Sequence, residues 1–107
     1  MKNVIATVLF MALASLALAA GGEEHVYSFK PGEGYVPDAA TAVKIAVAIW
    51  EPIYGVATIA REKPYRAALR DGIWVVEGSL PDGFVGGVAI AEIAKDDGRI
   101  LRVSHGK

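Results

Sequence analysis

The stretch PDAATAVKIAVAIWEPIYG at residues 37–55 predicts the one long helix of this chain. Asp38 can cap its first turn, because an aspartate accepts hydrogen bonds from first-turn amides and its charge suits the positive end of the helix dipole. Gly55 suits the left-handed conformation in which many helices end, and Pro52 can kink the last turn. Apolar residues at helical spacing predict one buried stripe, formed by Ala39, Ala42, Val43, Ala46, Ile49, Trp50 and Ile53.

The helix is also apolar beyond this stripe. Ile45 and Val47 lie off it, and Lys44 is the only charge between Asp38 and Glu51. A helix with one exposed face normally carries more polar residues on that face. Either other parts of the chain cover this flank, or the flank is a surface for a partner. Ile45 and Val47 are therefore candidate partner-binding residues.

Downstream of a connection at residues 56–63, the sequence predicts a β-hairpin whose register can be worked out. Asp71-Gly72 is a favoured two-residue turn, and it places Arg66 opposite Glu77 and Leu69 opposite Trp74. One face of the hairpin is then apolar, and it comprises Tyr65, Ala67, Leu69, Trp74, Val76 and Gly78. The helix should dock on this face, which favours Trp50 and Trp74 as core residues; the alternative is that they stack on a ligand.

A second hairpin is predicted from strands at Val88–Ala94 and Arg99–His105. Its parity places Glu92 and His105 on one face, close enough for long side chains to interact. One hypothesis is that Glu92 and His105 line a pocket, together with Tyr54 and Trp74, as an acid/base pair or as anchors for a ligand. The alternative is that Glu92 accepts a hydrogen bond from a Tyr hydroxyl or a Trp indole while His105 is solvated.

These elements together predict an α+β fold, in which one long helix packs on a curved antiparallel sheet of about four strands. The domain should cover residues 35–107, after a flexible leader at residues 20–34. Residues 1–19 have the pattern of a signal peptide, with an apolar segment followed by Ala17-Leu18-Ala19. We expect cleavage after Ala19 and a periplasmic or secreted protein with no stable membrane insertion. A second interpretation is an uncleaved membrane anchor.

Composition excludes several classes of function. The chain of 107 residues has a formal net charge of −1, which gives no excess of basic residues for binding nucleic acid. It has no cysteine, which removes disulfides, thiolate nucleophiles and Cys-ligated zinc. Two histidines eighty positions apart do not suggest a metal site, and no nucleophile or phosphate-binding motif occurs. We expect no catalytic residues, no metal and no cofactor.

Several short motifs occur in an order that resembles small bacterial immunity proteins with a nuclear transport factor 2-like fold, which are associated with polymorphic toxin systems. They are Tyr35-Val36-Pro37-Asp38, Ala42, Ile49-Trp50, Pro52-Ile53-Tyr54-Gly55, Lys63-Pro64-Tyr65, Trp74-Val75-Val76, Gly78, Leu80-Pro81, Gly86-Gly87-Val88, Glu92-Ile93, Asp97-Gly98-Arg99-Ile100-Leu101 and His105-Gly106-Lys107. The resemblance implies a truncated cone of helix and sheet, of the nuclear transport factor 2-like or cystatin-like kind. It also implies a non-enzymatic protein that neutralises a toxin.

Three hypotheses about function therefore stand. The first is an exported protein that binds and neutralises a cognate toxin from a neighbouring gene. The second is a small periplasmic ligand-binding module or enzyme with a pocket around Glu92 and His105. The third is a homodimer in which an exposed sheet face is paired with itself.

Overall fold

The computed structural model describes residues 27–107. The expected signal peptide and the first part of the leader lie outside these residues. Residues 27–30 belong to one compact unit, and Pro31–Lys107 form another. The second unit holds the helices and the sheet, and it begins four residues before the expected domain start at Tyr35. The main chain explains this, because the Gly34 N–H donates to the Pro31 carbonyl at 2.9 Å and the Tyr35 N–H donates to the Asp96 carbonyl at 2.9 Å.

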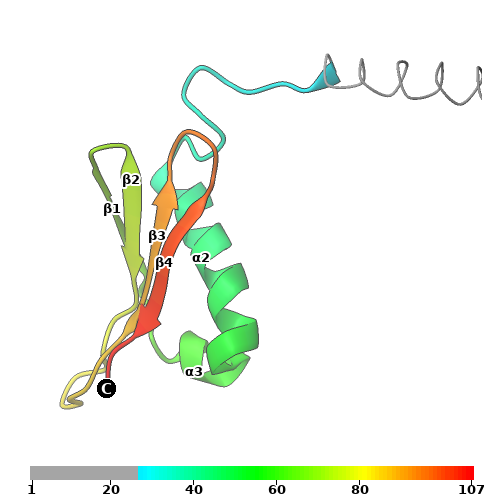
Figure 1. Ribbon diagram of the computed structural model, residues 1–107. Helices are drawn as coiled ribbons and strands as arrows, with labels where there is room; N and C mark the ends of the chain where they lie inside the picture. The colour runs from blue at the N-terminus through cyan, green and yellow to red at the C-terminus, as the bar shows by residue number, and fades with distance from the viewer. Residues whose placement is uncertain (1–26) are drawn as a thin grey trace, which may run out of the picture. The chain divides into compact units, whose positions relative to one another are not determined.

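This unit is an α+β structure, as the sequence predicts. Two helices lie on one side of a single antiparallel sheet with the strand order β1-β2-β3-β4 (Figure 1). The elements are α2 (Ala39–Tyr54), α3 (Val56–Ala60), β1 (Arg66–Arg70), β2 (Ile73–Glu77), β3 (Ala89–Ala94) and β4 (Ile100–His105). Helix α2 packs against β1, β2 and β3. No helix among residues 27–107 is long and apolar enough to cross a membrane.

Helix α2 begins and ends where the sequence predicts. The Asp38 carboxylate accepts a hydrogen bond from the Thr41 N–H at 2.8 Å, which caps the first turn. The Thr41 hydroxyl, which donates to the same carboxylate at 2.7 Å, and then this N–H hold the pKa of Asp38 below its ordinary value. Gly55 follows the last turn with φ of 96°, a conformation that favours glycine. The predicted stripe is buried at its centre, whereas its two ends, Ala39 and Ile53, are exposed.

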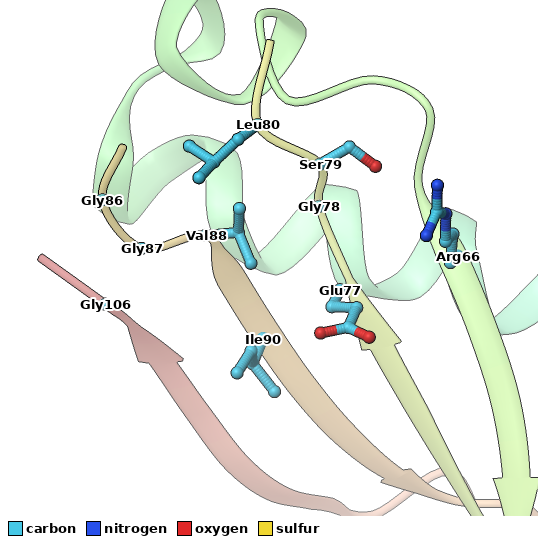
Figure 2. Close-up of a pocket in the computed structure, with 10 residues that line it drawn as sticks. All are labelled: Arg66, Glu77, Gly78, Ser79, Leu80, Gly86, Gly87, Val88, Ile90 and Gly106. Atoms are coloured by element: carbon cyan, nitrogen blue, oxygen red, sulfur yellow. The ribbon is translucent and has the colours of Figure 1, made fainter. Parts of the chain in front are cut away.

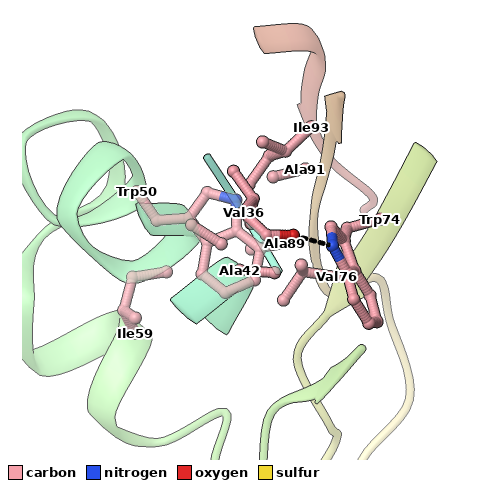
Figure 3. Close-up of a cluster of buried hydrophobic side chains, with 10 residues drawn as sticks. Val36, Ala42, Trp50, Ile59, Trp74, Val76, Ala89, Ala91 and Ile93 are labelled. Atoms are coloured by element: carbon pink, nitrogen blue, oxygen red, sulfur yellow. Dashed lines mark hydrogen bonds between the residues drawn. The ribbon is translucent and has the colours of Figure 1, made fainter. Parts of the chain in front are cut away.

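The core lies between α2, α3 and the sheet (Figure 3). Trp50 is fully buried, and its indole N–H donates to the Ile90 carbonyl at 3.3 Å. The Trp74 indole donates to the Val36 carbonyl at 2.8 Å, which ties the segment before α2 to the sheet. Both tryptophans are thus core residues whose single polar group is satisfied, as buried indoles usually are.

The hairpin of β1 and β2 has the predicted register. Arg66 lies opposite Glu77, Leu69 lies opposite Trp74, and the strands close on Arg70 and Ile73. Asp71 and Gly72 have φ of 50° and 75°, as a type I′ turn requires. Within the part of the chain that the structure describes, Arg66 and Glu77 form no ion pair.

The hairpin of β3 and β4 corrects a prediction. Ile93 pairs with Ile100, which is the expected parity, but Glu92 then pairs with Arg102 and leaves Leu101 as an extra residue. This β-bulge reverses the faces of the rest of β4, because side chains alternate along a strand. Glu92 consequently lies on the face turned away from the helices, whereas His105 lies on the helix side opposite Ala89. The two side chains do not share a face.

Candidate functional site

The carboxylate beside His105 belongs to Glu62, directly after α3. Glu62 is the one buried charged residue among those described, with 6% of its surface exposed. Its Oε1 accepts the N–H of Ala89 at 2.7 Å, and its Oε2 lies 2.7 Å from Nε2 of His105. Its main-chain carbonyl accepts the N–H of Ser79 at 2.7 Å. One side chain therefore joins the end of α3 to β3 and to the end of β4.

Gly78 provides the space for this carboxylate. A Cβ at position 78 would lie 2.8 Å from the Cβ of Glu62 and would also overlap its carboxylate oxygen. Such contacts are closer than packed atoms allow, so a side chain at position 78 would displace Glu62. A glycine directly after β2 is thus required by a side chain sixteen positions earlier.

His105 is placed to carry a positive charge. Its Nδ1 lies 2.7 Å from the carbonyl oxygen of Gly106, and its Nε2 faces the Glu62 carboxylate. Both partners are acceptors, and only the doubly protonated imidazole donates from both nitrogens. The hydrogen bond to Gly106, and then that to Glu62, raise the pKa of His105 above its ordinary value of 6.5. The Tyr54 ring lies against the imidazole, with 5.0 Å between ring centroids.

This raised pKa predicts a pH-dependent stability. The contribution of His105 is fully present below its unfolded pKa and is lost as the pH rises through the higher folded pKa. We expect the free energy of unfolding, measured by urea denaturation, to fall across that window. The variant His105→Gln should lose this part of the profile. An unchanged profile in His105→Gln would show that another group is responsible.

The segment after His105 is held by a close contact between two glycines. The N–H of Gly106 donates to the carbonyl of Val88 at 3.2 Å, and Gly87 lies directly against Gly106. A Cβ on Gly87 would overlap the main chain of Gly106. Only hydrogen atoms fit between these two backbones, so the chain passes Gly87 at a distance that no other residue allows.

We expect Gly87→Ala to destabilise the protein by about 1–3 kcal/mol, because the added methyl forces the main chain of residues 105–107 to move. Gly32→Ala is the matched control, since Gly32 has open space around it and no left-handed φ. Thermal unfolding of the two variants measures the difference. Equal effects of the two substitutions would contradict the close contact.

A small pocket opens over the Glu62–His105 pair. It measures about 180 Å³, and its apolar walls are Leu80, Pro81 and Phe84. A larger open hollow of about 550 Å³ lies on the face of the sheet turned away from the helices (Figure 2). Its lining includes Arg66, Glu77, Val88 and Ile90, and it contains none of the buried polar groups described above.

The structure brings together only some of the predicted site residues. His105 and Tyr54 are in contact, but Trp74 is 8% exposed and lies in the core. Glu92 forms an ion pair with Arg102 at 3.1 Å on the opposite face of the sheet, and not a hydrogen bond with a Tyr or a Trp. The predicted pocket around Glu92 is therefore wrong.

Ile45 and Val47 are half-buried and pack against the core, so part of the apolar flank of α2 is covered by the chain itself. Glu62 was missed because it lies in a segment expected to be a connection. One signal could have found it, since Glu62 follows Ile59 by three residues and helical spacing puts both on one side.

The geometry of the Glu62–His105 pair is that of a structural link. Each oxygen of Glu62 accepts a hydrogen bond, and each ring nitrogen of His105 has a partner within the protein. Among residues 27–107, no group of three or more His, Asp or Glu side chains is placed to hold a metal ion. The pair instead fixes α3, the loop after β2 and the last residues in one arrangement.

Most of this unit is similar to known proteins. A family described as NTF2 fold immunity protein matches residues 41–107. The chain is 42% identical over 73 residues to the uncharacterized protein YhhH of Escherichia coli (strain K12). The aligned region covers 67% of this chain and 58% of that protein. The chain thus spans little more than half the length of this relative. No solved structure matches the chain.

Proposed function

Because the chain belongs to the NTF2 fold immunity protein family, we propose that it is an exported, non-enzymatic binding protein that neutralises a toxin. Family membership is the observation that carries this proposal, since the match runs from the first turn of α2 to residue 107. The Glu62–His105 pair is consistent with the non-enzymatic part, because each of its oxygens and ring nitrogens has a partner within the protein. The signal-peptide pattern of residues 1–19 supports export.

The proposed partner is a toxin that acts in the cell envelope and is encoded by a neighbouring gene. An exported inhibitor would meet such a toxin on the outer side of the inner membrane. Residues exposed at the end of the unit near α3 are suited to contact, since Phe84 and Val85 of the loop between β2 and β3 are 68% and 97% exposed. Exposed loops held by a rigid scaffold often carry binding function.

Co-expression tests the proposal. Products of the adjacent genes are directed to the periplasm in a host with and without this chain, and growth is recorded. We expect one product to be toxic alone, to be neutralised by this chain and to bind it in purified form. The control is Trp50→Ala, which should weaken rescue because it destabilises the folded protein. Absence of rescue and binding for every neighbouring product would contradict the proposal.

Export has its own test. N-terminal sequencing of the protein from the periplasmic fraction is expected to begin at Ala20. A chain that retains Met1 in the membrane fraction would contradict cleavage, and would favour an anchored protein.

A further inference from the structure

Strand β1 forms one edge of the sheet, and its main chain is open to a partner (Figure 1). The two-residue turn closes on a hydrogen-bonded pair, and such pairs alternate along an antiparallel ladder. Arg66, Ala68 and Arg70 therefore bond to β2 through their main chains. Ala67 and Leu69 turn their N–H and C=O groups toward the free edge.

No other part of the described chain satisfies these outward groups. The main-chain hydrogen bonds of residues 27–107 outside the helices and strands include none to Ala67 or Leu69. Four of the five residues of β1 are exposed, and the fifth, Ala67, is half-buried. An edge of this kind is a template for pairing with another strand.

Both charged residues of β1 are positive. Arg66 and Arg70 lie four residues apart on one face, which separates them by about 13 Å along the strand. Both are exposed, and within residues 27–107 neither forms an ion pair. Ala68 lies between them on the same face. The edge therefore presents two unpaired guanidinium groups beside two unpaired main-chain positions.

A second copy of this chain does not fit the edge. Antiparallel pairing of β1 with itself over all five residues would place Arg66 opposite Arg70 of the other copy, twice. Like charges directly opposite each other destabilise a strand pair. The other edge strand, β4, carries Arg102 and no acidic residue, so it offers no better match. Charge thus opposes self-pairing at this edge and favours an acidic strand.

We propose that the free edge of β1 binds an extended acidic segment of a partner protein by strand addition. Carboxylates four residues apart in that segment would lie opposite Arg66 and Arg70, and its main chain would pair with Ala67 and Leu69. Small or β-branched residues between the carboxylates would lie opposite Ala68 and its neighbours. The inference rests on the proposed function for the partner's identity as a toxin, whereas the edge can be tested without it.

The test uses a synthetic peptide, acetyl-Gly-Glu-Val-Thr-Val-Glu-Gly-amide, and the same peptide with Lys in place of both Glu. Each is titrated to millimolar concentration into the ¹⁵N-labelled protein at low salt. We expect the acidic peptide to shift the amide signals of Ala67 and Leu69 and to slow their hydrogen exchange. The basic peptide should leave these amide signals unchanged, and added salt should weaken the binding of the acidic peptide. Equal shifts from both peptides, shifts located elsewhere, or no shift would overturn the proposal.

Variants test the recognition of charge and the pairing of main chains separately. Reversing both charges with Arg66→Glu and Arg70→Glu should weaken the acidic peptide about tenfold or more and allow the basic one to bind. Ala67→Pro removes an outward N–H that the fold does not use, so binding should be lost while β1 stays paired with β2. Arg99→Glu, at an exposed turn outside β1, is the control and should bind like the unmodified protein. Unfolding curves confirm that each variant is folded.

The two proposals fail in different ways. If rescue fails but the acidic peptide occupies β1, the toxin-neutralising role is wrong and the edge site stands. If a toxin binds but Arg66→Glu/Arg70→Glu and Ala67→Pro retain its affinity, the toxin contacts another surface and the edge inference is wrong.

Discussion

Replacing Trp50 with alanine is expected to lower the free energy of unfolding by about 3–5 kcal/mol, the range for removing a large aromatic residue from a core. Trp50 is the largest fully buried side chain, and it lies where α2 meets the sheet. Its indole also donates to the carbonyl of Ile90, so the substitution leaves a cavity and removes this hydrogen bond. The chain has no disulfide that could offset this loss.

A small domain has a stability of only about 5–15 kcal/mol, so this loss removes much of the margin. Urea denaturation followed by tryptophan fluorescence and circular dichroism measures it, with Trp74 as the remaining probe. The matched control is Ile53→Ala on the same helix, since Ile53 is 57% exposed and its truncation should cost less than about 0.5 kcal/mol. Similar losses in the two variants would mean that Trp50 is not central to the core.

The elements predicted most accurately from the sequence are those whose signals are local. Asp38 and Gly55 mark the ends of α2 through capping chemistry that depends on a few neighbouring residues. Asp71-Gly72 determines the turn type and therefore the register of β1 and β2. These interactions span only a few positions, which is why periodicity and turn composition are sufficient to identify them.

The candidate site could not be predicted in the same way, because its geometry depends on distant contacts. The extra residue Leu101 in β4 reverses the side of the sheet on which His105 lies, and no residue near it signals a bulge. The acid that His105 meets comes from Glu62, forty-three positions earlier. The sequence thus predicted a carboxylate beside His105, but the residue there is Glu62 and not Glu92.

The same contacts give a physical reason for three glycines of the ordered motifs, Gly78, Gly87 and Gly106. Gly78 gives space to the Glu62 carboxylate, and Gly87 lies against Gly106 beside His105. Substitution at any of the three brings a side chain into occupied space. These three glycines of the ordered motifs therefore belong to one cluster at the end of the sheet.

This cluster leads to the second large effect, which is the loss of the Glu62 carboxylate. We expect Glu62→Ala to lower the free energy of unfolding by about 3 kcal/mol, near the lower end of the range for breaking a buried ion pair. The substitution leaves the N–H of Ala89 without its acceptor and the His105 cation without its counter-charge. The lower end applies because about a quarter of the His105 side chain remains exposed to water, which screens the pair.

A double-mutant cycle isolates the pair from the other hydrogen bond of Glu62. Glu62→Gln, His105→Gln and the double variant are compared by urea denaturation below pH 6.5, the ordinary pKa of histidine. We expect a coupling of about 1–2 kcal/mol, since contacting charged groups are not additive. The coupling should shrink as the pH rises through the raised pKa of His105, because the imidazole then loses its charge.

Glu92→Gln and Arg102→Gln form the matched exposed pair on the opposite face, where a coupling of less than about 1 kcal/mol is expected. A coupling at Glu62–His105 no larger than that of the exposed pair, at every pH, would show that the buried carboxylate acts only through Ala89.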